Sequence, residues 1–85
     1  MILEKHLIPG KLYKIGVGYS LSIQKPKSLE FFGLIQTNDM LMYLGPNVLV
    51  ESWNLVSNHL FLYDTQIINL GVYTLDYEEV FLEVV

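Results

Sequence analysis

The chain has 85 residues, enough for one domain around one core, and we assign residues 1–85 to that domain. It contains no cysteine, which excludes disulfides and thiolate metal sites. Hydrophobic residues make up 52% of the chain and the formal net charge is −4, a balance that argues against general DNA binding.

The first predicted elements are a turn and a long strand. Pro9-Gly10 is typical of a type II β-turn, in which glycine supplies the positive φ. From Tyr13 to Ile23 every odd position is apolar and every even position is polar or glycine. This alternation predicts one strand with one buried face. Gly16 and Gly18 predict a bulge or bend within it.

The middle of the chain predicts short strands separated by turns. These strands are residues 29–37, 40–44 and 48–51. They follow an exposed loop at 24–28, and Gly33 predicts a close approach of another backbone. Asn38-Asp39 predicts a tight hairpin turn between the first two strands, and Gly45-Pro46-Asn47 predicts a turn before the third.

The last third predicts further strands at 59–64, 66–75 and 80–85, with a polar connection at 76–79. The pattern of residues 52–58 predicts either a loop or one turn of 3₁₀ helix, with Trp53 closing a barrel end. Asn69 and Gly71 predict a break in the strand that contains them. The final strand is almost wholly apolar, so we expect it to be covered by its own sheet or by a second copy of the chain.

Six or seven short strands with frequent turns predict an all-β fold. We expect a small antiparallel barrel of the SH3-like kind with five to seven strands, or a compact β-sandwich. The absence of alanine, the strongest helix former, agrees with this class.

No membrane span or secretory leader is predicted. The apolar runs are far shorter than a span, and residues 1–6 lack the features of a signal peptide. We therefore expect a non-secreted, cytoplasmic protein. The arginine-free composition rich in Lys, Ile and Asn is typical of AT-rich genomes, including many phages and viruses and some marine bacteria, and a viral origin would place the protein in the virion or host cytoplasm.

The sequence favours a protein that is not an enzyme and holds no cofactor or metal. It has no nucleophile-elbow, zincin or phosphate-loop motif. No ligand spacing accompanies its two histidines, His6 and His59. The acidic residues of 76–79 lack the spacing of a calcium loop, and we interpret them as a solvated connection.

Charge is unevenly distributed. Residues 1–27 hold all five lysines and one acid (+4), whereas residues 28–85 hold eight acids and no base (−8). This asymmetry is either a chance pattern on solvated faces or a surface for a partner. The candidate partner-binding residues are Lys11, Lys14, Lys25, Lys27 and Trp53. We expect a protein-protein interaction or assembly module that binds another protein or itself, as a homodimer or ring. An acidic nucleic-acid mimic that inhibits a basic enzyme is an alternative.

Two short segments resemble known families. "LFLYDTQ" at 60–66 resembles the opening motif of Src-homology peptide-binding domains, but it stands late in the chain and follows Trp53, so we do not predict polyproline binding.

"GLIQTNDMLMYL" at 33–44 resembles the first motif of Sm and Sm-like RNA-binding proteins. Gly33, Ile35, Asp39 and Met42 stand at that spacing. The resemblance implies a small barrel that binds single-stranded RNA or DNA, with Asp39 in a uridine pocket and Tyr43 in place of the family's asparagine. The second motif of the family requires arginine, which this chain lacks.

Overall fold

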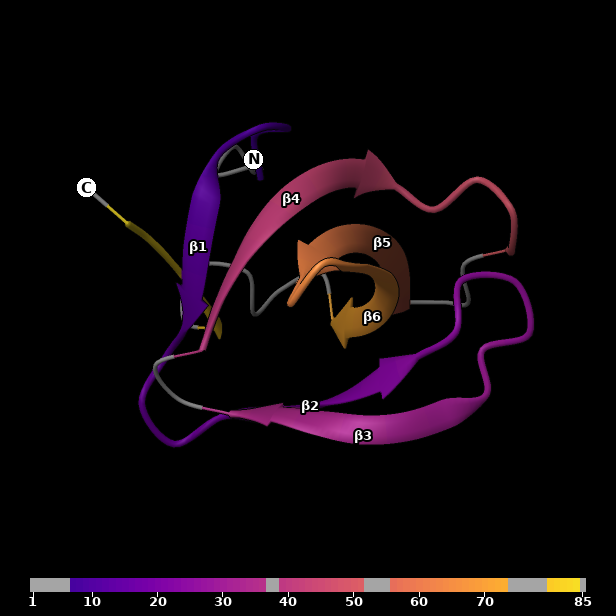
Figure 1. Cartoon of the computed structure of the whole chain (residues 1–85), viewed down its shortest axis with the longest axis horizontal. Helices are drawn as coiled ribbons and strands as arrows, with labels where there is room; N and C mark the ends of the chain where they lie inside the picture. Colours follow the sequence, from indigo (N-terminus) through magenta and orange to yellow (C-terminus); the bar gives the residue numbers. More distant parts are fainter. Residues whose placement is uncertain (1–6, 37–38, 52–55, 74–79, 85) are drawn as a thin grey trace.

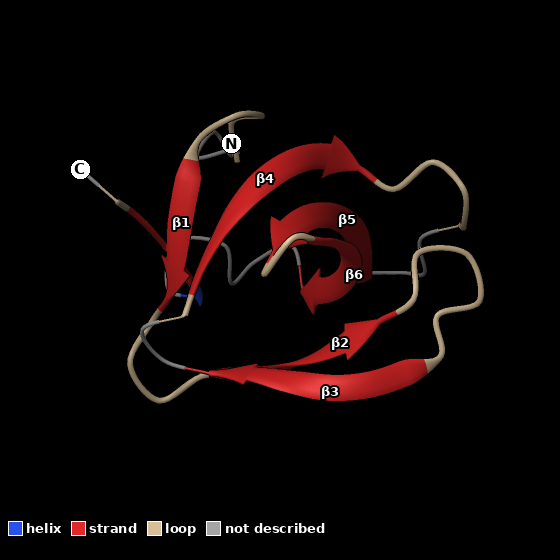
Figure 2. Ribbon diagram, in the orientation of Figure 1, coloured by secondary structure: helices blue, strands red, loops and turns tan. Residues whose placement is uncertain are grey.

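Seven antiparallel strands form one sheet in the computed structural model of the chain, which describes residues 7–36, 39–51, 56–73 and 80–84 (Figure 1, Figure 2). The strands are β1 (Leu12–Ile15), β2 (Ser20–Gln24), β3 (Phe31–Gln36), β4 (Met40–Pro46), β5 (Val56–Tyr63), β6 (Gln66–Tyr73) and β7 (Phe81–Glu83). Their order across the sheet is β3-β2-β6-β5-β4-β1-β7. The prediction of an all-β fold is confirmed.

The sheet is strongly curved but not closed. In Figure 1, β4 arches across the top of the view, β2 and β3 run along the bottom, and β5 and β6 lie between them. Among the described strands, β3 and β7 are the two edges and do not pair with each other. The sheet is therefore not the closed barrel that the sequence predicts.

The core occupies the inner face of the curved sheet. Its buried apolar side chains are Tyr13, Ile15, Ile23, Ile35, Leu41, Tyr43, Phe61, Ile68, Leu70, Val72, Val80 and Phe81. Phe61 lies at its centre, with ring centroids 5.2 Å from Phe81 and 5.2 Å from Tyr43. These contacts bring β4, β5 and β7 together, although β5 and β7 are not neighbours in the sheet.

The predicted strand at 13–23 is two strands. β1 ends at Ile15, and the chain turns at Val17 and Gly18, where Gly18 has a φ of +90° and Val17 is exposed. The backbone N–H of Tyr19 donates to the carbonyl of Gly16 across this turn. Inward positions resume at odd numbers after the turn, so the alternation in sequence hides it. The Pro9-Gly10 turn is confirmed, with Gly10 at a φ of +89°.

Two predictions about the middle of the chain are wrong. β3 and β4 do not form a hairpin, because β3 pairs with β2 whereas β4 pairs with β1 and β5. Residues 48–51 are not a strand but an exposed loop. Its first turn is set by Asn47, whose side-chain carbonyl accepts a hydrogen bond from the backbone N–H of Leu49 at 3.0 Å.

The predicted break in the strand containing Asn69 and Gly71 is also absent. β6 pairs with β5 without interruption, from Gln66 opposite Tyr63 to Tyr73 opposite Val56. The hairpin turns at Asp64 and Thr65, with φ values of 51° and 63°. Two consecutive positive φ values are typical of a type I′ turn, whose usual Asn-Gly or Asp-Gly signature this pair lacks.

Asn69 is instead the centre of a buried amide cluster on the other face of the sheet. Its side-chain NH₂ donates to Gln24 Oε1 at 2.9 Å and to Asn58 Oδ1 at 3.0 Å, and its carbonyl accepts from Asn47 Nδ2 at 2.8 Å. Asn47 also donates to the carbonyl of Pro26. The cluster therefore ties the loops after β2 and β4 to the β5–β6 hairpin.

This cluster stands at the one point where β2 meets β6. The backbone register between these strands consists of the single pair Gln24–Asn69. Toward Ser20 the two strands diverge, which leaves a hollow of about 470 Å³ beside Gly71 and the Asn58 side chain. The β2–β3 hairpin is thus joined to the rest of the sheet by backbone pairing at one end, while Ile23 and Ile35 pack into the shared core.

The sequence predicts close packing around Gly33, but the structure has it around Gly71 instead. A Cβ added at Gly33 would have Ile23 Cδ1 as its nearest neighbour, at an ordinary 3.9 Å. A Cβ at Gly71 would lie 3.3 Å from Asn58 Oδ1 and 3.5 Å from Val56 Cγ1. Asn58 cannot move away without stretching its hydrogen bond to Asn69.

We predict that Gly71→Ala lowers the free energy of unfolding by about 1–2 kcal/mol, because the methyl group strains a buried hydrogen bond. Gly33→Ala is the matched control and should change stability by less than about 0.5 kcal/mol or raise it slightly. Urea denaturation measures both. Equal effects of the two substitutions would contradict the proposed packing.

Candidate interaction surface

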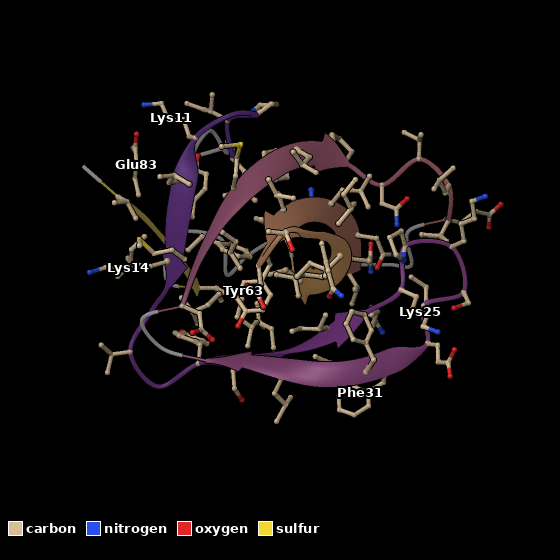
Figure 3. All side chains as sticks on the ribbon, viewed as in Figure 1. Lys11, Lys14, Lys25, Phe31, Tyr63 and Glu83 are labelled. Carbon is tan, nitrogen blue, oxygen red and sulfur yellow. The ribbon has the colours of Figure 1, made fainter. Side chains whose placement is uncertain are left out.

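The candidate lysines do not form one surface. Lys11 and Lys14 project from the β1 region, whereas Lys25 lies at the opposite end of the molecule in the loop between β2 and β3 (Figure 3). Lys27 belongs to the same loop as Lys25. The predicted basic surface is therefore divided into two separate pairs.

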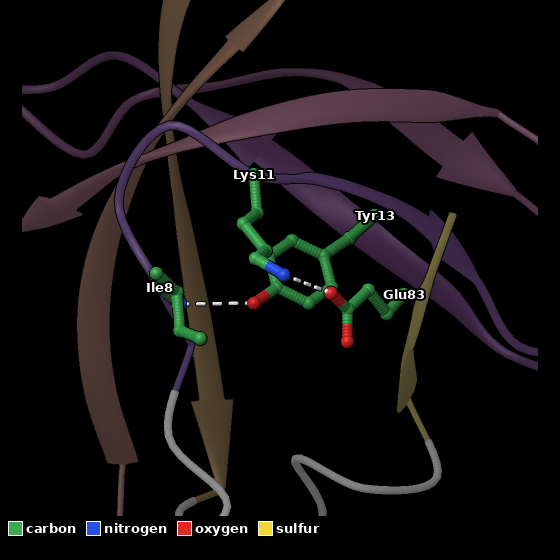
Figure 4. Close-up of polar contacts among 4 residues, drawn as sticks. All are labelled: Ile8, Lys11, Tyr13 and Glu83. Carbon is green, nitrogen blue, oxygen red and sulfur yellow. Dashed lines mark hydrogen bonds and ion pairs between the residues drawn. The ribbon is translucent and has the colours of Figure 1, made fainter. Parts of the chain in front are cut away.

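Two of these lysines are already paired with acids of the same chain. Lys11 Nζ lies 2.5 Å from Glu83 Oε2, next to the hydrogen bond that the Ile8 N–H donates to the Tyr13 hydroxyl (Figure 4). Glu83 and its hydrogen bond raise the pKa of Lys11. Lys25 Nζ lies 3.4 Å from Glu30 Oε1. The uneven charge along the sequence is thus partly neutralised in space.

The remaining predicted site residues lie apart from these lysines. Trp53 lies outside the described residues. Asp39 is half-buried and directly precedes β4. Burial of the Tyr63 side chain raises its pKa, and the negative charge of Asp39 raises that pKa further. Tyr43 is only 3% exposed, so its ring faces the core and offers no face on which a base could stack.

Tyr43 forms a buried polar pair with His59. The Tyr43 hydroxyl and His59 Nδ1 are 2.8 Å apart, and both side chains lie on the core face of neighbouring strands. Burial lowers the pKa of His59 to about 4, so its ring is neutral at pH 7. Both side chains are buried, so the pair is part of the core.

The outer face of the sheet carries a continuous row of apolar side chains. Leu12 of β1 is opposite Met42 of β4, Met42 is opposite Leu62 of β5, and Leu62 is opposite Ile67 of β6. Each follows or precedes a buried core residue, so strand alternation directs all four away from the core. We call these four residues the outer row.

The outer row is accessible and has distinct ends. Leu12, Leu62 and Ile67 are 38–55% exposed, and Met42 is half-buried. At the β1 end, Lys14 lies opposite Met40 and Leu82, which are also exposed. At the β6 end, Ile67 borders a shallow hollow of about 430 Å³ that Pro26 and Phe32 also line.

Comparisons of this chain with known protein families, with curated proteins and with solved structures find no match. In the described part of the chain, no cluster of three His, Asp or Glu side chains is arranged to hold a metal ion. No described helix has the length and apolar character needed to cross a membrane.

The outer row is not evident from the amino-acid sequence alone. Its members are ordinary strand residues, and only the register of four strands places them side by side. The available signal is that apolar residues occupy both alternating sets in β4 and β5, as in "MLMYL" and "LFLY". That pattern indicates either burial on both faces or one buried and one interacting face.

We predict that the stability of the protein falls as the pH drops from about 6.5 toward 4. In this range the unfolded chain binds a proton at His59 that the folded chain does not, because the folded pKa is depressed. The loss attributable to His59 should be about 2 kcal/mol, allowing for incomplete burial of the ring.

His59→Gln is the variant that isolates this effect, since all carboxylates are common to both proteins. Urea denaturation near neutral pH and near pH 4.5 should show a smaller loss of stability for the variant than for the original chain. Identical losses would show that His59 is not held neutral by the fold.

Proposed function

We propose that this chain is a non-catalytic protein-interaction module that binds a partner protein through the outer row. The observation that carries the proposal is the register that aligns four outward apolar side chains across four strands. Contiguous exposed apolar surface is costly for a soluble protein and marks interaction sites. An apolar face on a partner would remove this surface from water.

The shape and charge of this surface indicate which features a partner needs. The centre of the outer row would accept a flat apolar surface, and the hollow between Ile67 and Phe32 has room for one anchoring side chain. Lys14 has no ion pair among those found in the described residues, so an acidic group of the partner would meet it at the other end. A complementary charge there would fix the orientation of binding.

The distribution of the lysines supports a protein partner rather than a nucleic acid. Phosphate binding relies on several cations along one groove. Here the two pairs of lysines lie at opposite ends, and two of the four have acidic neighbours. The SH3-like and Sm-like resemblances stay predictions, and neither is needed for binding through the outer row.

We predict that Ile67→Lys weakens partner binding at least tenfold, equivalent to about 1.4 kcal/mol, because it places a charge in the apolar contact. Val48→Lys is the matched control, since Val48 is an equally apolar and more exposed residue in the loop after β4. Both sites are exposed, so both variants should keep their stability within about 0.5 kcal/mol.

The measurement starts with capture from a lysate of the source organism on the three immobilised proteins, followed by titration of the purified captured protein. Support requires a protein that the original chain and Val48→Lys retain and Ile67→Lys does not. If no protein distinguishes Ile67→Lys from Val48→Lys, the outer row is not the binding surface.

A further inference from the structure

The two edges of the sheet differ in how well they are protected. β7 has three residues, and its Glu83 pairs with Lys11. Short edges that carry charge resist pairing with other strands. β3 is twice as long, reads Phe-Phe-Gly-Leu-Ile-Gln, and contains neither a charged residue nor proline; it has one bulge, at Phe32, and pairs regularly with β2 from Gly33 to Gln36. Among the described strands it pairs with β2 alone.

β3 also exposes large apolar side chains. Phe31 is 59% exposed, Phe32 43% and Leu34 53%. Figure 3 shows Phe31 projecting outward beyond β3. Together the exposed parts of these side chains offer about 300 Å² of apolar surface. A standard interface buries about 800 Å² per partner, a little over half of it apolar, so β3 supplies the greater part of the apolar area that a stable dimer needs.

We propose that β3 pairs with β3 of a second copy of this chain, antiparallel, with Gly33 opposite Gly33 of the partner copy. The two-fold axis is perpendicular to the sheet and passes between the two glycines. The two seven-stranded sheets become one continuous sheet, in which the backbone groups that face away from β2 on both β3 strands join in a new ladder.

The side chains of β3 favour this register. Antiparallel pairing that keeps each face continuous must join positions of equal parity. Pairing about Gly33 places Phe32 of each copy, the extra residue of a bulge against β2, beside Leu34 of the other, which gives two contacts between exposed aromatic and aliphatic side chains. A shift to pairing about Leu34 would place Phe32 opposite the polar Gln36. The axis therefore falls at the one β3 residue that has no side chain.

A second copy of the chain is the partner that fits best, because a symmetric dimer leaves no β3 edge exposed. Each copy has one long neutral edge, and antiparallel pairing uses both of them at once. The dimer then ends on both sides at β7, the short edge that carries Glu83. A foreign strand would satisfy one β3 edge equally well, but the symmetric pair needs no other component. The β3–β3 pairing uses none of the four outer-row side chains and shares only Phe32 with the hollow beside Ile67, so Leu34→Lys and Ile67→Lys test the two surfaces separately.

Light scattering tests the assembly. The original chain should have twice the 9.8 kDa mass of one copy at high micromolar concentration and should keep it in about 0.5 M salt, because the contact is apolar. Leu34→Lys should raise the dissociation constant at least about 100-fold, because it places a charged side chain opposite Phe32 in both contacts.

Ser22→Lys is the matched control. Ser22 is exposed and lies opposite Leu34 on β2, one strand inside the edge, so a lysine there leaves the dimer intact. Circular dichroism on both variants verifies that they remain folded. A monomeric original chain overturns the proposal. So does a folded Leu34→Lys variant that dimerises as well as Ser22→Lys.

A cysteine reporter tests the register, because the chain has no cysteine of its own. Gly33→Cys fits the fold, as a Cβ there meets only Ile23 Cδ1 at 3.9 Å. Under mild oxidation Gly33→Cys should form a disulfide-linked dimer, whereas Ser22→Cys should stay unlinked. Equal linkage of the two variants, or none in Gly33→Cys, overturns the pairing about Gly33.

Discussion

The hydrogen bonds of the Asn69 side chain determine how the two parts of the sheet fit together. The amide is fully buried, so leaving its donors or acceptor unpaired would cost about 1–3 kcal/mol each. It is satisfied only when Gln24, Asn47 and Asn58 are all in place. These partners come from β2, from the loop after β4 and from β5. One side chain thus positions three elements at the point where the β2–β3 hairpin joins β6.

The surfaces proposed for binding follow from this attachment and from composition. The hairpin is held by β2, which leaves β3 as an edge. A chain in which 52% of the residues are hydrophobic has more apolar side chains than the inner face of a seven-stranded sheet can bury. The surplus lies on the outer row and on β3. Both surfaces are therefore consequences of one curved sheet, whose outer face the described loops cover around Asn69 but not over the outer row.

Local pattern predicted the class of fold and several core positions but not the pairing of strands. Alternation correctly identified Tyr13, Ile15 and Ile23 as inward, and Pro9-Gly10 as a turn. Alternation could not detect the turn at Val17 and Gly18, because inward positions resume at odd numbers after it, whereas Gly16 and Gly18 did predict a bulge or bend there. Neighbours in the sheet, such as β2 and β6, are distant in sequence, so no local signal specifies them. The outer row depends on that pairing, so the sequence did not predict it. The candidate lysines were chosen because they are close in the sequence, but the two pairs lie apart in space.

The attachment of the β2–β3 hairpin through Asn69 is tested most directly by residue-resolved native-state hydrogen exchange on Asn69→Leu. The substitution keeps the branched skeleton of the side chain but leaves the amides of Gln24, Asn47 and Asn58 without their shared partner. Amides of β2 and β3 should lose protection well before those of β5 and β6, because the hairpin opens as a separate unit. A uniform loss of protection across the sheet, or protection in β2 and β3 equal to that of the original chain, would contradict the role assigned to Asn69.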